Sequence, residues 1–438
     1  MAYGGGSWVT ENKVLPGSYI NFISAARASA VLSDRGIATL PLELDWGPEQ
    51  QIFTVEQGEF QTDSLKLFGY PYTAEQLRPV REIFAHAKTV HFFRLNAGGE
   101  KASCTYATAC HPGTRGNELK VVIEENEAST PEKKLYDLAT YLGTTQVDYQ
   151  QGLAEMAQAQ DNDYLVFNQD SSLSATASTP LTGGTNGTAE DAAYQLYLDR
   201  AEPYPFNAMG CPSADPLIQQ LFAAYARRMR EEVGKKFQVV CFRNLADHES
   251  VISLKNGLSG DTETPALVPW VTGVAAGTAA NASATSLAYD GEYTPDTDYT
   301  QTELAEGIQE GSFMFHREGT EILVLRDINS FTSFTEDKGE DFSSNQVIRS
   351  MDQIANDVAL AFKSRYIGKM PNDGAGRISF WNELVTLHKQ YEKIRMLENF
   401  DSEQLTVAPG ETKKAVLVTE HVNIVTAMEQ LYMAVYVH

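Results

Sequence analysis

Cysteine is scarce in this chain of 438 residues. There are four cysteines, Cys104, Cys110, Cys211 and Cys241, and none of them forms a CxxC pair. So few cysteines in so long a chain exclude a small disulfide-stapled domain and are typical of proteins made in a reducing compartment. We therefore expect synthesis in the cytosol.

Basic residues are also few relative to acidic ones. The chain has 34 Lys and Arg against 58 Asp and Glu, which gives a formal net charge of −24 and a pI of about 4.7. An electrostatic field of this sign repels the phosphates of nucleic acids and the head groups of anionic lipids. We expect no nucleic-acid partner.

Long apolar runs are missing. Nowhere does the sequence reach the roughly 18 consecutive apolar residues that a membrane-spanning helix needs. The start of the chain, from Met1 to Trp8, has neither the cationic first segment nor the apolar core of a signal peptide. The expectation is a protein with no membrane insertion and no export signal.

Catalytic and metal-binding motifs are missing too. The glycine-rich stretch 183–187 lacks the Lys-Ser/Thr pair of a phosphate-binding loop, and no GxSxG nucleophile elbow is present. Cys104, Cys110 and His111 do not have the spacing of a common zinc site. The glycines of 183–187 and of Gly374-Ala375-Gly376 are better explained as turns or hinges. We expect no cofactor, no metal and no enzymatic activity.

What the sequence does contain is an ordinary globular composition, with 42% hydrophobic and 10% aromatic residues, over a length that predicts about two to four domains. A β-rich run at 37–44, a helical pattern at 77–87 and a buried run at 89–95 follow one another. A second helix is predicted from Pro216 to Gly234, followed by a strand at 237–242. This alternation is typical of an α/β domain.

Three further regions differ from this pattern. Residues 97–182 contain short β runs separated by turn residues and bracketed by glycine pairs, which predicts an inserted β-sandwich. A small-residue helix is expected at 268–278. The last hundred residues contain a strand at 323–328 and helices at 344–366 and 377–398.

Both ends of the chain carry apolar β-type runs, at 15–23 and at 431–438. An isolated run of this kind is an aggregation hazard unless another strand pairs with it, and strand addition to a second copy is a physical use for it. Two such ends in each copy make an open lattice possible. The residues expected to make these contacts are Tyr19, Ile20, Phe22, Ile23, Leu431, Met433, Val435 and Val437.

Motifs spread along nearly the whole chain resemble one protein family. They are Leu15-Pro16-Gly17-Ser18-Tyr19, Arg35-Gly36-Ile37, Asp45-Trp46-Gly47-Pro48, His111-Pro112-Gly113, Leu181-Thr182-Gly183-Gly184, Gly234-Lys235-Lys236-Phe237, Pro269-Trp270-Val271-Thr272-Gly273, Tyr366-Ile367-Gly368-Lys369 and Ala427-Met428-Glu429-Gln430. In this order they are similar to contractile tail sheath proteins of phages and phage-tail-like bacteriocins, of the type in defective Bacillus prophages and clostridial tail particles.

The resemblance implies a discontinuous domain organisation. It predicts an N-terminal arm at 1–26, a subtilisin-like α/β domain without a protease triad at 27–96 and 183–325, the β-sandwich at 97–182, and an α+β C-terminal domain at 326–438. In this family the terminal arms add strands to the C-terminal domains of neighbouring subunits.

The function implied is mechanical. The chain would polymerise as stacked rings around a tail tube protein, and contraction would drive the tube through a target cell envelope. Baseplate and tail-terminator proteins would be its other partners, and assembly would take place in the cytoplasm of the bacterial host. A helix of the C-terminal domain faces the tube in this family, and Lys389, Lys393 and Arg395 are the candidate contacts.

Two other classes of protein stay open on the residues alone. An α/β hydrolase or protease would show a clustered nucleophile and base in a pocket. A β-sandwich surface adhesin would need export, for which the sequence gives no signal.

Overall fold

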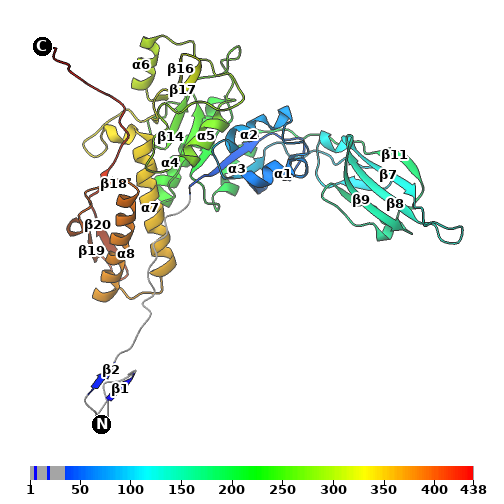
Figure 1. Ribbon diagram of the computed structural model, residues 1–438, viewed down its shortest axis with the longest axis horizontal. Coiled ribbons are helices and arrows are strands. Elements are labelled where there is room, and N and C mark those ends of the chain that lie inside the picture. The colour runs from blue at the N-terminus through cyan, green and yellow to red at the C-terminus, as the bar shows by residue number, and fades with distance from the viewer. Residues whose placement is uncertain (1–3, 7–16, 20–34, 438) are drawn as a thin grey trace. The chain divides into compact units, whose positions relative to one another are not determined.

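The computed structural model describes residues 4–6, 17–19 and 35–437 (Figure 1). Among them, 357–423 form one compact unit and 35–356 together with 424–437 form another. At the N-terminal end, β1 (Gly4–Gly6) pairs in parallel with β2 (Gly17–Tyr19). Of the residues predicted for the N-terminal contacts, Tyr19 ends β2, whereas Ile20, Phe22 and Ile23 lie outside the described residues.

A seven-stranded sheet organises the larger unit. Its strands are, in spatial order, β15 (Ser312–Phe313), β14 (Val251–Leu254), β13 (Gln238–Phe242), β12 (Ala208–Gly210), β3 (Ile37–Leu42), β5 (Thr89–Arg94) and β4 (Ile52–Glu56). The pairings are parallel except between β4 and β5, so the antiparallel strand lies at one edge. Every residue of β13 and β14 is buried, as expected for central strands covered on both faces.

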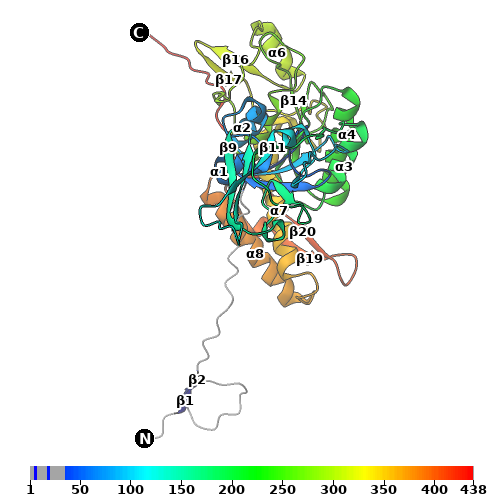
Figure 2. The same cartoon turned by 90° about the vertical axis from the view of Figure 1, so that its right-hand side faces the viewer.

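Helices cover the two faces of this sheet (Figure 2). One apolar cluster joins the sheet to α1 (Gln57–Phe68), α2 (Arg78–Phe84) and α5 (Val268–Gly277). A second cluster on the opposite face joins it to α3 (Asp191–Ala201) and α4 (Pro216–Arg228). The predicted alternation of strands and helices is therefore present, with one core on each face.

The small residues of α5 allow a close approach to the end of α2, as the sequence predicts for 268–278. A Cβ atom added to Gly273 would lie 2.4 Å from the carbonyl oxygen of Ile83, and one on Gly277 would lie 2.0 Å from that of His86. Both separations are far inside van der Waals contact, so neither position accepts a side chain without backbone movement.

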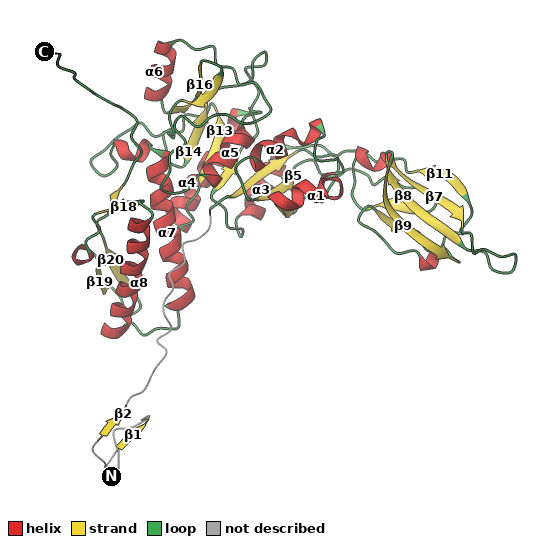
Figure 3. Cartoon of the chain, viewed as in Figure 1, coloured by secondary structure: helices red, strands yellow, loops and turns green. Residues whose placement is uncertain are grey.

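Residues 97–182 contain a four-stranded antiparallel sheet in the order β11 (Thr176–Pro180), β7 (Leu119–Glu125), β8 (Tyr136–Leu142) and β9 (Thr145–Leu153) (Figure 3). Two shorter strands, β6 (Ala107–Ala109) and β10 (Leu165–Phe167), pair beside a third apolar cluster. The β runs expected here from the sequence, at 102–109, 118–124, 134–141 and 164–167, include neither β9 nor β11. Strand β9 is a polar and mostly exposed edge strand, and its pairing with β8 has register shifts.

The remaining elements lie toward the C-terminus. They are α6 (Gln301–Gln309), β16 (Phe315–Glu318), β17 (Glu321–Val324), α7 (Asn345–Arg365), α8 (Gly374–Lys393), β18 (Leu397–Glu398), β19 (Thr406–Pro409), β20 (Val416–Thr419) and β21 (Asn423–Ile424). The helix predicted at 344–366 is α7, almost to the residue. The strand predicted at 323–328 is shorter and shifted to β17.

The boundaries predicted for the next helix were wrong. It starts at Gly374 instead of residue 377, because the Asp373 carboxylate accepts a hydrogen bond from the Gly376 amide at 2.8 Å and caps the first turn. Gly374-Ala375-Gly376 is therefore the start of a helix and not a turn. The helix ends at Lys393, and Arg395 beyond it has a left-handed backbone with φ of 58°.

Buried ion pairs hold the first half of α7 within the larger unit. Arg349 and Asp327 lie 2.5 Å apart, and Asp352 pairs with Arg230 at the same distance; all four side chains are at most 8% exposed. Burial alone would raise the pKa of Asp327. The charge and hydrogen bond of Arg349, with hydrogen bonds from Ala284 and Asn345, outweigh burial and hold this pKa below its usual value.

The substitution Arg349→Met should destabilise the fold strongly, because it leaves the Asp327 carboxylate buried without its counterion. We expect the free energy of unfolding to fall by about 3–5 kcal/mol at pH 7, measured by urea denaturation. Arg200→Met, which removes an exposed arginine from α3, is the matched control.

The decrease in the free energy of unfolding caused by Arg349→Met should also depend on pH. Without Arg349, burial dominates and places the pKa of Asp327 above its unfolded value, so protonation favours the folded state as the pH falls. The penalty of Arg349→Met should therefore shrink between pH 7 and pH 5. A penalty as small as that of Arg200→Met at pH 7 would contradict the role of this pair.

Candidate interaction surfaces

Residues 430–437, here called the C-terminal arm, expose a series of large apolar side chains. Leu431, Met433, Val435 and Val437 are 84%, 74%, 70% and 91% exposed. The arm has no regular secondary structure in this chain, although its composition is that of a strand. The segment thus leaves a contiguous apolar surface exposed, and strand addition to a second copy stays a prediction for it.

An exposed stripe runs along α8 and carries two lysines near the end of the helix. Ile378, Asn382, Thr386, Lys389 and Lys393 are all exposed and follow helical spacing. Of the two acidic residues of the helix, Glu392 is partly exposed and lies three residues from Lys389, whereas Glu383 is not on the surface. Glu383 is buried and accepts a hydrogen bond from Arg365 at 2.5 Å, and Glu392 accepts one from the Phe400 amide at 3.1 Å.

The lysine end of the stripe therefore has Glu392 as an acidic neighbour, and one oxygen of that carboxylate is engaged by the Phe400 amide. Arg395, the third predicted tube contact, is exposed but lies past the end of α8. It does not continue the helical series of Lys389 and Lys393.

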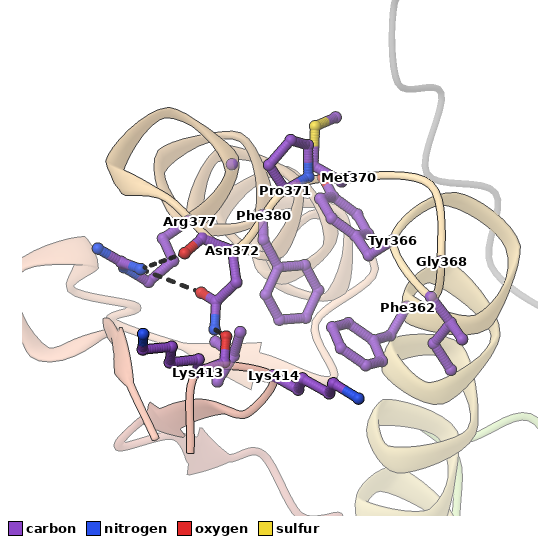
Figure 4. A pocket seen from close by; sticks show the side chains of 13 residues that line it. Phe362, Tyr366, Gly368, Met370, Pro371, Asn372, Arg377, Phe380, Lys413 and Lys414 are labelled. Atoms are coloured by element: carbon purple, nitrogen blue, oxygen red, sulfur yellow. Dashed lines mark hydrogen bonds between the residues drawn. The ribbon is translucent and has the colours of Figure 1, made fainter. Parts of the chain in front are cut away.

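A cavity of about 450 Å³ lies between the end of α7, the start of α8 and the β19–β20 hairpin (Figure 4). Its apolar wall contains Phe362, Tyr366 and Phe380, with the Tyr366 and Phe380 rings 4.8 Å apart. Asn372 donates to the carbonyl oxygens of Lys413 and Ala415 and so ties the helical hairpin to the β hairpin. Sequence reasoning did not find this cavity, because its walls come from separate segments.

The residues considered for zinc are packing residues. The His111 ring lies edge-on to Trp46 with 5.1 Å between ring centroids, and the Cys110 thiol donates to the Asn162 carbonyl at 3.4 Å. Burial, helped by the charges of Lys101 and Arg94, lowers the pKa of His111 to about 4. Among residues 35–437, no group of three or more histidine, cysteine or acidic side chains is arranged to hold a metal ion.

His111 should make stability depend on pH. Its folded pKa lies below its unfolded value of about 6.5, so the unfolded state takes up a proton first and stability falls as the pH drops below about 6.5. We expect His111→Phe, which keeps a ring beside Trp46, to remove about 1 kcal/mol of the decrease between pH 7 and pH 5, measured by urea denaturation. The exposed His421→Phe is the control, and equal pH profiles for the two variants would contradict this assignment.

The described part of the chain contains no helix that is both long and apolar enough to span a bilayer.

Family models of phage tail sheath proteins match the chain from near its beginning to its end. Residues 35–95 match the domain III N-terminal region of tail sheath protein Gp18, and 97–186 match the tail sheath protein beta-sandwich domain. Residues 187–330 match the central domain and 337–438 the C-terminal domain of phage tail sheath proteins.

Individual proteins of this kind are similar over almost their whole length. A sheath tail protein from Desulfitobacterium hafniense has 34% sequence identity and a TM-score of 0.81, covering 94% of this chain and 98% of its own. The phage-like element PBSX protein XkdK of Bacillus subtilis is 27% identical over 99% of this chain and 100% of its own. The contracted helical sheath of the anti-feeding prophage shares the fold at 12% identity, with a TM-score of 0.57 over 97% of this chain and 99% of its own.

These matches define a structural protein of mixed α/β architecture that forms multimeric sheaths. The chain belongs to the phage tail sheath family and is a subunit of a contractile tail sheath, as its sequence motifs predict. Such a sheath is part of a phage or of a phage-tail-like particle.

Proposed function

We propose that this subunit polymerises as stacked rings around a tail tube and contracts to drive the tube through a target cell envelope. The observation that carries the proposal is the exposed apolar C-terminal arm on a chain of the tail sheath family. No nucleotide is required, because the free energy is stored when the extended lattice assembles and is released by a change between two packings of the same subunits. On this proposal the protein has no catalytic role.

The two-stranded β19–β20 sheet is the proposed acceptor for arms from neighbouring copies. Its pairing runs from Thr406 with Thr419 to Pro409 with Val416, and the Leu417 side chain is 58% exposed. The open edges of a two-stranded sheet can pair with further strands, and alternate side chains then set the register. The N-terminal residues Tyr19, Ile20, Phe22 and Ile23 are proposed as a second donor strand.

The finer organisation is part of the same proposal. A nearly all-parallel sheet with helices on both faces supports a subtilisin-like domain from 27–96 and 183–325. The antiparallel strands within 97–182 support a β-sandwich insertion. The proposed organisation also includes an N-terminal arm at 1–26 and a C-terminal domain at 326–438 that ends in a second arm. Tube, baseplate and tail-terminator proteins are the proposed partners, and the host cytoplasm is the proposed place of assembly.

If the C-terminal arm pairs as a strand, its alternate side chains lie on two faces, and each face can be changed separately. A variant with Leu431, Met433, Val435 and Val437 all changed to Ser should lose sheath assembly. Burying each of these side chains is worth roughly 1.5–3 kcal/mol, so contacts between copies should weaken by several orders of magnitude. Sedimentation and electron microscopy of the purified protein measure the loss.

The matched control changes Tyr432, Ala434 and Tyr436 to Ser, on the other face of the same predicted strand. This variant should keep more assembly than the first. Tubes of normal length from the four-serine variant would overturn the role of the arm.

The stripe on α8 is the proposed contact with the tube. Replacing Lys389 and Lys393 by Glu should weaken co-assembly with tube protein and leave self-assembly of free sheath intact. Exposed ion pairs are worth about 0–1 kcal/mol each and are screened by salt, so the wild-type interaction should also decrease as salt is added.

Co-pelleting with tubes across a salt series measures this contact. Arg395→Glu, past the end of α8, tests separately whether the third predicted cation takes part. Unchanged co-pelleting of the Lys389 and Lys393 variant at low salt would show that the stripe does not face the tube.

A further inference from the structure

The C-terminal arm does not leave the larger unit freely, because the five residues before it are held by side chains of three other segments. These residues, 425–429, are here called the arm root. Val425 and Ala427 are bound through their backbone and Glu429 is bound through its carboxylate. Each of them has a partner in the body of the unit, and the exposed arm begins directly after the last of them.

Gln346, in the first turn of α7, binds the backbone of the arm root at two points. Its amide nitrogen donates to the Val425 carbonyl at 3.2 Å, and its amide oxygen accepts from the Ala427 amide at 2.9 Å. The same nitrogen also donates to the Asn281 carbonyl at 3.1 Å, and the residue is 3% exposed. The buried Gln346 amide thus pairs with one carbonyl and one N–H group of the arm root, which in a sheet would pair with a neighbouring strand.

Glu429 is held by two donors at the end of the arm root. One carboxylate oxygen accepts from the Thr285 hydroxyl at 2.9 Å, and the other accepts from the Arg326 guanidinium at 2.8 Å. Bonds to an ionised acceptor are stronger than neutral ones, and the Glu429 side chain is 28% exposed, so the pair is partly shielded from water.

The same donors connect the arm root to α7. The Thr285 hydroxyl accepts a hydrogen bond from the Asp327 amide at 3.0 Å, and the Asp327 carboxylate pairs with Arg349. Gln346 and Arg349 lie three residues apart in α7, so they are neighbours on its surface. The arm root and the start of α7 therefore belong to one continuous network of polar contacts.

We propose that Gln346, Thr285 and Arg326 form a latch, in which these positioning residues hold Val425, Ala427 and Glu429 and fix the point where the C-terminal arm leaves the subunit. The consequence for assembly rests on the proposed function of the arm. If the arm pairs with a neighbouring copy, a pull along it acts on Glu429 and is passed to α7 and the sheet. The free length of the donor strand is then set at residue 430.

Amide hydrogen exchange of the full chain tests the latch without any assembly, at a concentration where sedimentation shows monomers. Glu429→Gln should raise the exchange rate of the Ala427 amide about threefold, because it weakens charge-assisted bonds. Gln346→Leu, which removes the acceptor of that amide, should raise it about tenfold. Glu336→Gln, an exposed carboxylate of the same unit, is the control.

A charge exchange separates positioning from a general loss of stability. Arg326→Glu alone should speed exchange at the arm root, and combining it with Glu429→Arg should restore part of the protection. Exchange in β13 should stay unchanged throughout. The latch would be overturned if Glu429→Gln and Gln346→Leu both left the exchange rate of the Ala427 amide equal to that in the Glu336→Gln control. It would also be overturned if adding Glu429→Arg to Arg326→Glu restored no protection.

Sheath assembly of the same variants separates the latch from the function of the arm. Fast exchange at Ala427 together with fewer or irregular tubes supports both the latch and the role of the arm in assembly. Fast exchange with normal tubes supports the latch and shows that assembly does not need a fixed arm root, while the four-serine variant tests the arm itself. The two proposals can therefore fail independently.

Discussion

The apolar side chains at the end of this chain are not buried by the chain itself. Leu431, Val435 and Val437 are each at least 70% exposed, and water contact of this kind is unfavourable by an amount that grows with area. Burial by another copy would remove that cost, which is the physical basis of the proposed association. The proposed sheath lattice depends on the C-terminal arm. Its apolar side chains would supply affinity, and its backbone hydrogen bonds would set the orientation of the added strand.

The C-terminal arm is attached to the start of α7 and, through that helix, to the sheet. A sheet covered on both faces resists deformation, and buried pairs such as Arg349 with Asp327 fasten the start of α7 to it. The arm root is tied to the same helix through Gln346. A contractile lattice needs rigid subunits connected by extensible links, and Glu429 is the residue at which Thr285 and Arg326 hold this segment.

Most elements could be predicted from the sequence where their signals are local. The helix at 345–365 follows a clear apolar period, and the parallel strands are continuous apolar runs. The start of α8 was missed because one hydrogen bond from the Gly376 amide to the Asp373 carboxylate decides it, and glycines there favour a turn by propensity. Strand β9 was missed because a polar edge strand has no periodic signal of its own. The motifs that carried the family resemblance led to a class that the comparisons confirm.

By itself the sequence determined the class of protein, the alternation of elements and the apolar character of both ends, since composition, periodicity and motif order are properties of the chain alone. Tertiary structure decided which polar residues meet. Gln346 and Ala427 are far apart in sequence, as are Thr285 and Glu429, and no local pattern marks either pair. It also decided that the Glu383 carboxylate is buried, where it accepts a hydrogen bond from Arg365, while Lys389 and Lys393 of the same helix stay exposed. Such pairings depend on the packing of distant segments, which a linear pattern does not encode.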